Sequence, residues 1–130
     1  VLDFAPTGLL ARLLLVSAYL VGGLTKLTDW QGAVAEQVHF GLTPPALWAA
    51  LTIAVELIGP LLILTGRLVW LGAGMLGVFT FFAALVANAF WAMPEGPARF
   101  GATNAFFEHM GLVGGFVLVA ILAYRTQRSA

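Results

Sequence analysis

The chain has 130 residues, of which 61% are hydrophobic and 9% are charged, with six basic and six acidic side chains. Soluble domains carry about 25% charged residues and need them to cover a large surface, so this composition excludes an ordinary water-soluble domain. A net charge of zero offers no basic field for nucleic acid, and the absence of cysteine excludes disulfides, cysteine nucleophiles and iron–sulfur clusters held by this chain.

Four segments approach or exceed the roughly 20 mainly apolar residues that a membrane-spanning helix needs. They are residues 8–27, 45–65, 68–92 and 105–124. The sequence therefore predicts an all-α integral membrane protein, a four-helix transmembrane bundle that forms one domain over residues 1–130. Its main partner is the lipid bilayer, and we expect it to pack against other protein subunits or further copies of itself.

The first segment carries polar residues at a regular spacing. Arg12, Tyr19 and Lys26 are seven residues apart, so they lie nearly on one face of a helix, which we expect to point into the bundle. Snorkelling of the lysine toward the membrane surface is the alternative for Lys26. The apolar run continues past Gly22 and Gly23 without a small-residue cleavage pattern, which favours a retained span over a signal peptide.

The connection after the first segment, residues 29–42, is the longest in the chain and partly apolar. We interpret it as a short interfacial helix or a re-entrant segment between the first and second spans. Glu36 and His39 have the Glu-x-x-His spacing of di-iron helix bundles, but one copy occurs where two are needed, and His39 is expected in a loop. A haem held by His39 and His109 is the other metal alternative; we predict neither metal site.

Glu56 lies about halfway along the second segment. A charge near the middle of the bilayer costs about 2.5–3.5 kcal/mol on insertion scales and marks a candidate functional residue. The alternative is a protonated glutamate, or one paired with Arg12, that only fixes helix packing. Pro60 has no backbone N–H, so the carbonyl of Glu56 loses its helical partner and a polar notch is expected at membrane depth.

The third and fourth segments add Asn88 and the pair Glu108 and His109, which we expect in the outer half of the membrane. Glu108 and His109 fall in the first turn of the predicted fourth span, where a glutamate also favours the helix dipole. We predict a binding pocket with Glu56 at its floor. Its predicted residues are Arg12, Tyr19, Lys26, Glu56, Asn88 and His109. Four unrelated polar residues, each bonded locally, are the alternative.

Basic residues predict the orientation, because cytoplasmic loops carry more Lys and Arg. With four spans, the side that holds both termini and the Gly66-Arg67 turn has four basic residues, and the other side has two, Lys26 and Arg99. We therefore expect an inner-membrane protein with both termini in the cytoplasm.

Several segments together resemble the DoxX family of small bacterial four-helix membrane proteins. The first is Arg12 with its apolar run and the later Gly22-Gly23-Leu24-Thr25-Lys26, the second is residues 55–66 around Glu56, and the third is Phe90-Trp91 followed by residues 106–115. This chain has Glu108-His109 where the family often has Lys-Asn. The resemblance implies a membrane subunit linked to redox work, as in a thiosulfate:quinone oxidoreductase.

Three functions follow as hypotheses. We favour an accessory or anchoring membrane subunit of a redox system, with no intrinsic cofactor, because the chain has no cysteine and its redox chemistry would need a borrowed cofactor or a partner. The second is a membrane oxidoreductase subunit that binds a quinone or another small molecule in the pocket around Glu56. A small-solute carrier is disfavoured, because four spans enclose little volume unless the protein oligomerises.

Overall fold

The computed structural model describes residues 5–129, with side chains described for residues 6–126, and contains helices without strands in that range. The elements are α1 (Ala5–Thr28), α2 (Trp30–His39), α3 (Pro45–Thr65), α4 (Val69–Ala87), the short 3-10 helix η1 (Phe90–Ala92) and α5 (Pro97–Ser129). Four helical stretches, residues 6–28, 45–65, 69–92 and 97–126, are long and apolar enough to cross a membrane. The predicted four-helix membrane architecture is confirmed, and the predicted short helix between the first two spans is α2.

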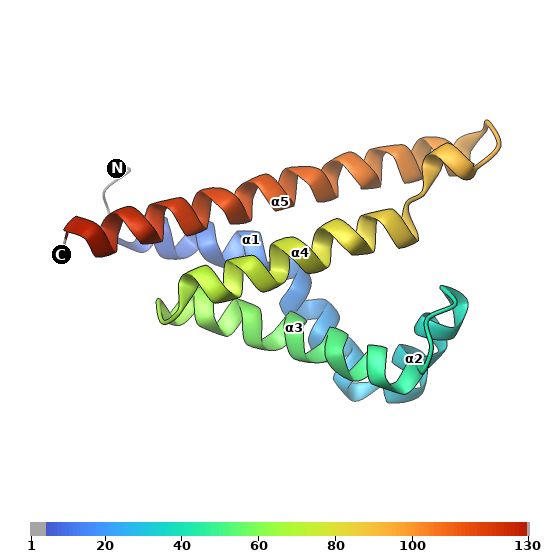
Figure 1. Cartoon of the computed structure of the whole chain (residues 1–130), viewed down its shortest axis with the longest axis horizontal. Helices are drawn as coiled ribbons and strands as arrows, with labels where there is room; N and C mark the ends of the chain where they lie inside the picture. The colour runs from blue at the N-terminus through green and yellow to red at the C-terminus, as the bar shows by residue number, and fades with distance from the viewer. Residues whose placement is uncertain (1–4, 130) are drawn as a thin grey trace.

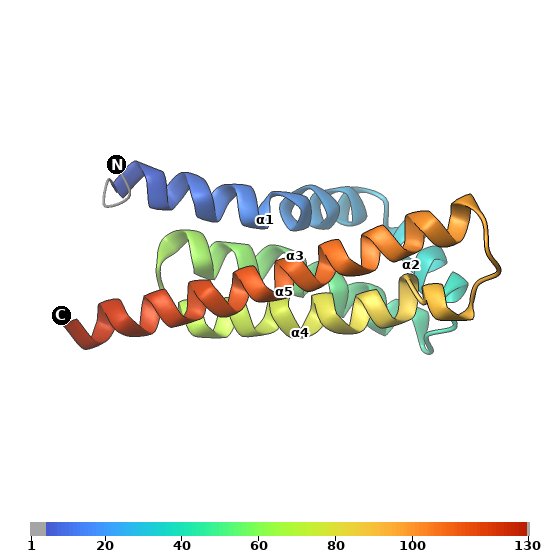
Figure 2. The same ribbon diagram turned by 90° about the horizontal axis from the view of Figure 1, so that it is seen from above.

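The four long helices lie side by side, with both ends of the chain at one end of the molecule and α2 at the other (Figures 1 and 2). α1 packs against α3, α3 against α4, and α4 against α5, whereas α1 meets α5 over a short stretch only. We call α1 to α3 one half of the bundle and α4 to α5 the other; the halves are joined by the packed surfaces of α3 and α4 and by the tight turn at Gly66. Figure 1 shows the halves diverging toward the end that holds α2.

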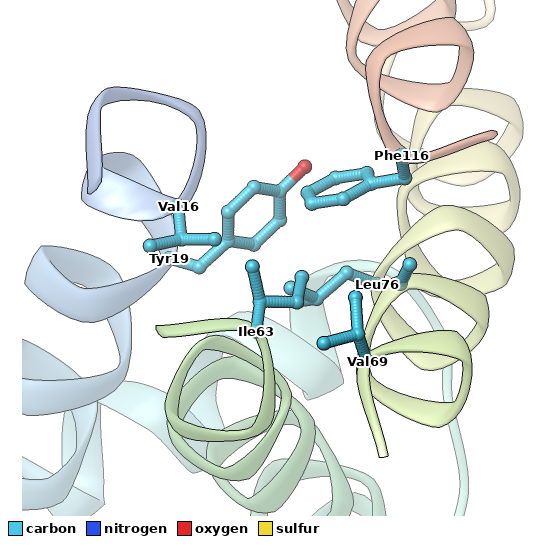
Figure 3. Close-up of a cluster of buried hydrophobic side chains, with 7 residues drawn as sticks. Val16, Tyr19, Ile63, Val69, Leu76 and Phe116 are labelled. Atoms are coloured by element: carbon cyan, nitrogen blue, oxygen red, sulfur yellow. The ribbon is translucent and has the colours of Figure 1, made fainter. Parts of the chain in front are cut away.

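The centre of the bundle is an apolar cluster contributed by all four long helices. Its members are Val16, Tyr19, Ile63, Val69, Ala73, Leu76 and Phe116. The ring of Tyr19 meets the ring of Phe116 edge to face at 5.5 Å, and Figure 3 shows Tyr19 reaching across from α1 toward α5. This contact links α1 to α5, two helices that meet over a short stretch only.

Small residues bring α3 and α4 close together. A Cβ atom placed on Gly72 would lie 2.7 Å from the carbonyl oxygen of Gly59, and one on Gly59 would lie 2.8 Å from Leu76 Cγ. Neither position leaves room for a side chain without a shift of backbone or core. Close approach of this kind is the usual basis of helix association in membranes, where lipid is as apolar as the helix surface.

α2 lies across the end of α3 rather than along the bundle. Asp29 caps its first turn, because the side chain accepts a hydrogen bond from the backbone N–H of Gly32. Ala33 is buried against Ala49 and Ile53 of α3, which attaches α2 to the bundle by one face. His39 is the last residue of α2, so its predicted position in a loop is wrong.

Two boundaries differ from the sequence prediction. The α-helix α4 ends at Ala87 with Asn88 as its C-cap, and the apolar residues after it form η1; the apolar stretch 69–92 still includes Asn88, as predicted. α5 begins at Pro97, since proline is favoured in the first turn of a helix. The predicted span began at residue 105 because the first residues of α5 are not part of the apolar run. Glu108 and His109 therefore lie several turns into α5, not in its first turn.

Large apolar side chains cover the outside of the bundle, as expected of a surface that faces lipid. Tryptophans cluster near the ends: Trp30, Trp48 and Trp91 are exposed at the α2 end, and Trp70 is exposed at the other. Trp48 donates its Nε1–H to the carbonyl oxygen of Thr43 in the loop before α3. Aromatic side chains with one polar atom prefer the two membrane interfaces, so their positions mark where the lipid begins and ends.

Candidate ligand cavity

A cavity of about 530 Å³ lies between the two halves of the bundle, on the side toward α2. All four long helices and α2 contribute to its wall. The lining residues are Ala18, Tyr19, Glu36, His39, Phe40, Glu56, Phe79, Thr80, Ala83, Ala87, His109 and Leu112. Small-molecule sites have volumes of roughly 300–1,000 Å³ and mix apolar walls with a few polar groups, so this space, called here the polar cavity, has the properties of a binding site.

Glu56 borders the polar cavity from α3 and is held by a lysine from α1. Lys26 Nζ donates to Glu56 Oε1 at 2.8 Å, and the two side chains are 17% and 8% exposed. Lys26 itself does not line the cavity, so it supports the carboxylate from behind. The packing alternative of a Glu56–Arg12 pair is wrong, because Glu56 pairs with Lys26, which lies two seven-residue repeats after Arg12 on α1.

Gly22 explains how the ion pair fits between two closely packed helices. A Cβ atom at Gly22 would lie 2.8 Å from Glu56 Oε2 and 3.4 Å from Lys26 Nζ. The bare backbone of α1 thus leaves the space that the carboxylate occupies. Gly23 plays the matching role for Leu57, whose Cδ2 atom would lie 2.7 Å from a Cβ there.

A second polar pair crosses the bundle next to Glu56. The hydroxyl groups of Tyr19 on α1 and Thr80 on α4 are hydrogen-bonded to each other, and both residues are buried. α1 and α4 are not neighbouring helices, so this bond links the two halves directly. Both residues line the polar cavity, and their hydroxyls are therefore candidates to contact a ligand as well as each other.

Histidines and a second carboxylate lie nearer the open end. Glu36 and His39 project from α2 and are exposed, and His109 on α5 is half-buried. His109 Nδ1 lies 2.6 Å from the carbonyl oxygen of Ala105, one turn earlier. A carbonyl can only accept, so Nδ1 carries a proton in this bond, and Nε2 is the ring nitrogen left for other partners.

Three predicted site residues, Tyr19, Glu56 and His109, line the polar cavity. Lys26 does not line it but is hydrogen-bonded to Glu56, which does. The other two lie elsewhere. Arg12 is at the opposite end of α1, where its guanidinium donates to the carbonyl oxygen of Ile63 at 3.4 Å near the C-terminus of α3. A cation there is favourable, since the last carbonyls of a helix carry partial negative charge. Asn88 terminates α4 and is not among the lining residues.

Thr80 is the site residue that the sequence interpretation missed. It is the lone hydroxyl-bearing residue in the apolar helix α4, and a single polar side chain at membrane depth is itself a signal of a buried partner. The alanines that leave the space open, Ala18, Ala83 and Ala87, carry no such signal. Among the described residues, no group of three or more His, Asp or Glu side chains is arranged to hold a metal ion.

A second hollow of about 570 Å³ runs along the outside of α4 and α5. Its wall is almost wholly apolar and includes exposed aromatic side chains such as Trp70, Phe81 and Phe82. Lipid chains fill surface grooves of this kind in a bilayer. The polar cavity is therefore the better candidate for a specific ligand.

Comparison with known proteins identifies the family. The family model described as DoxX matches residues 8–89, which include most of α1 and all of α2, α3 and α4. The chain belongs to the DoxX family. Of the residues that line the cavity in this DoxX protein, all but His109 and Leu112 lie inside the matched segment. The resemblance on which the redox hypothesis rests is thereby confirmed at the level of the family.

A relative supports the membrane location of this DoxX protein. This chain is 25% identical over 113 residues to the inner membrane protein YphA of Escherichia coli (strain K12). The alignment covers 87% of this chain and 80% of YphA. No solved structure matches this chain. The apolar helices, the family and this relative together establish a membrane protein in a lipid bilayer.

Proposed function

We propose that this DoxX protein is an accessory subunit of a membrane-associated redox system and that it holds a quinone-class molecule in the polar cavity. The carrying observation is a cavity at membrane depth where Glu56, Tyr19 and His109, from three different helices, converge. Charged and hydrogen-bonding groups are unfavourable in lipid, so a cluster of them beside an open space indicates a ligand. The redox assignment itself comes from the DoxX resemblance.

The shape of the cavity suits an amphipathic ring. Phe79, Leu112 and the alanines offer apolar walls, while polar groups come from both halves: Tyr19, Glu36, His39 and Glu56 from α1 to α3, and Thr80 and His109 from α4 and α5. A quinone head group has an apolar ring with two polar oxygens, and its tail is soluble in the surrounding lipid. We propose that a partner subunit supplies or accepts the electrons, and that this chain binds and positions the ring.

A cavity-filling variant tests this function without removing a polar group. Ala83→Leu places a larger side chain in the cavity wall, and Ala50→Leu makes the same exchange on an exposed part of α3 that lines neither hollow. Each protein is purified in native-membrane particles, and its bound quinones are extracted and quantified by mass spectrometry. We expect quinone with the wild type and Ala50→Leu, and at least a tenfold loss with Ala83→Leu.

Equal quinone content in all three proteins, at the level of the bulk lipid, would contradict the proposed ligand. The same particles are also analysed for co-purified proteins. Recovery of a redox enzyme with Ala83→Leu as well as with the wild type, but without bound quinone in any sample, would favour the purely anchoring function.

A further inference from the structure

The polar atoms that line the cavity are mostly hydrogen-bond acceptors. Glu36 and Glu56 bring carboxylates, and no lysine or arginine is among the lining residues. The nearest cation, Lys26, is already bonded to Glu56. A ligand in this space therefore meets oxygens and nitrogens that need a proton from it, rather than fixed positive charge.

Glu56 keeps one oxygen available. Its Oε1 atom accepts from Lys26, and in the described part of the chain every fully buried side-chain nitrogen or oxygen has a hydrogen-bond partner. Oε2 has no such bond, so it retains accessible surface beside the bare backbone of Gly22, and the Glu56 side chain also borders the polar cavity. Oε2 can thus accept one hydrogen bond without breaking the ion pair.

His109 adds a second acceptor from the opposite half of the bundle. In the tautomer whose Nδ1 donates to the carbonyl of Ala105, the ring presents Nε2 with a lone pair. The Tyr19 and Thr80 hydroxyls have two protons between them and use one in their mutual bond, which leaves a single donor. The buried part of the cavity therefore offers one hydroxyl donor against the acceptors on Glu56 and His109.

Because acceptors outnumber donors in the buried part of the cavity, we infer that the polar cavity selects the reduced, hydroxyl-bearing form of its ligand, a hydroquinone. This inference rests on the proposed function. A hydroquinone donates two O–H groups, which suit Glu56 Oε2 and His109 Nε2. The oxidised quinone has carbonyl oxygens alone and would leave these acceptors unpaired. Lys26 already neutralises Glu56, so an ammonium ligand is disfavoured relative to a neutral donor.

The discriminating experiment compares the two redox forms on the same protein. Wild-type protein in lipid nanodiscs is titrated anaerobically with decylubiquinol and with decylubiquinone, and the dissociation constants are measured by calorimetry. We expect the quinol to bind about tenfold more tightly, the ratio expected for one hydrogen bond left unmade.

Two variants test whether His109 causes the preference for quinol over quinone. His109→Phe removes Nε2 and is expected to weaken quinol binding about tenfold and to reduce the preference for quinol over quinone. Glu108→Gln is the matched control, since Glu108 is the neighbouring exposed residue and does not line the cavity, and it is expected to bind both forms as the wild type does. Circular dichroism and gel filtration verify that each variant is folded.

The outcomes separate this inference from the proposed function. If neither form binds the wild type, the proposed function itself fails. If both forms bind equally, or the quinone binds more tightly, the ligand class stands and the selectivity for the reduced form is overturned. Stronger competition by decylammonium than by the quinol would overturn the inference in favour of a cationic ligand.

Discussion

Lys26 and Glu56 form an ion pair across 2.8 Å between α1 and α3, with both side chains largely removed from solvent. Removing one member of such a pair leaves an uncompensated charge, whereas replacing both by apolar residues is often tolerated. We expect Lys26→Met to destabilise the bundle by roughly 3 kcal/mol. The double variant Lys26→Met with Glu56→Leu should recover most of that loss.

The measurement is the free energy of unfolding in mixed micelles, followed by circular dichroism as a denaturing detergent is added. Glu56→Gln serves as the conservative variant, because its amide oxygen still accepts from Lys26. A double variant as unstable as Lys26→Met alone would show that the pair is needed for packing rather than for function.

The Tyr19–Thr80 hydrogen bond is predicted to couple the two halves of the bundle. Tyr19→Phe and Thr80→Val each remove one hydroxyl, and each is expected to cost about 1 kcal/mol of unfolding free energy. Because the two groups bond each other, the double variant should cost less than the sum of the singles, with a coupling of about 1 kcal/mol. Strictly additive losses would mean that the hydroxyls act independently.

Gly72 and Gly74 provide a matched test of helix packing on α4. A Cβ at Gly72 would collide with the backbone of α3, whereas nothing lies within 4 Å of one at Gly74. We expect Gly72→Ala to destabilise the protein by roughly 1–3 kcal/mol, the usual cost of overpacking. Gly74→Ala should be neutral or slightly stabilising, because alanine favours helices. Thermal unfolding in the same detergent decides, and a neutral Gly72→Ala would refute the close contact.

The orientation in the membrane is predicted from the basic residues. Arg12 contacts the C-terminal end of α3, Arg67 lies in the turn after α3 and Arg125 lies near the end of α5, while the side chain of Arg128 lies outside the described residues. The excess over the other end predicts cytoplasmic termini. Reporter fusions after Gln127 and within the loop at Gly96 test this. Cytoplasmic activity of the first and external activity of the second are expected, and the reverse pattern would contradict it.

The sequence predicted the helices well, because the length and apolarity of a span are set by the bilayer itself. It correctly predicted that Tyr19 and Glu56 face the inside of the bundle. The seven-residue repeat indicated this for Tyr19, and the cost of a charge in lipid indicated it for Glu56. It did not predict that the α-helix α4 stops at Ala87 within the apolar stretch 69–92, nor that α5 starts at Pro97, because neither change alters the apolar pattern.

Partners across helices could not be derived in the same way. The reach of the lysine side chain and the space left by Gly22 decide that Lys26, and not Arg12, pairs with Glu56. Both depend on the relative height and distance of α1 and α3, which follow from packing of the whole bundle. The cavity is likewise a property of how the two halves diverge, and its small lining alanines gave no pattern to recognise.

The two halves meet at a tight turn on the side of the chain ends and separate on the side of α2, where the polar cavity lies. A soluble domain or enzyme attached near either terminus would therefore stand on one side of the bilayer, while small molecules enter from the other. A ligand that fills the cavity between the halves would act on the angle between them, and a change in that angle would reach the side of the chain ends. Tyr19 and Thr80, hydrogen-bonded across that angle, are the pair on which such a change would first act.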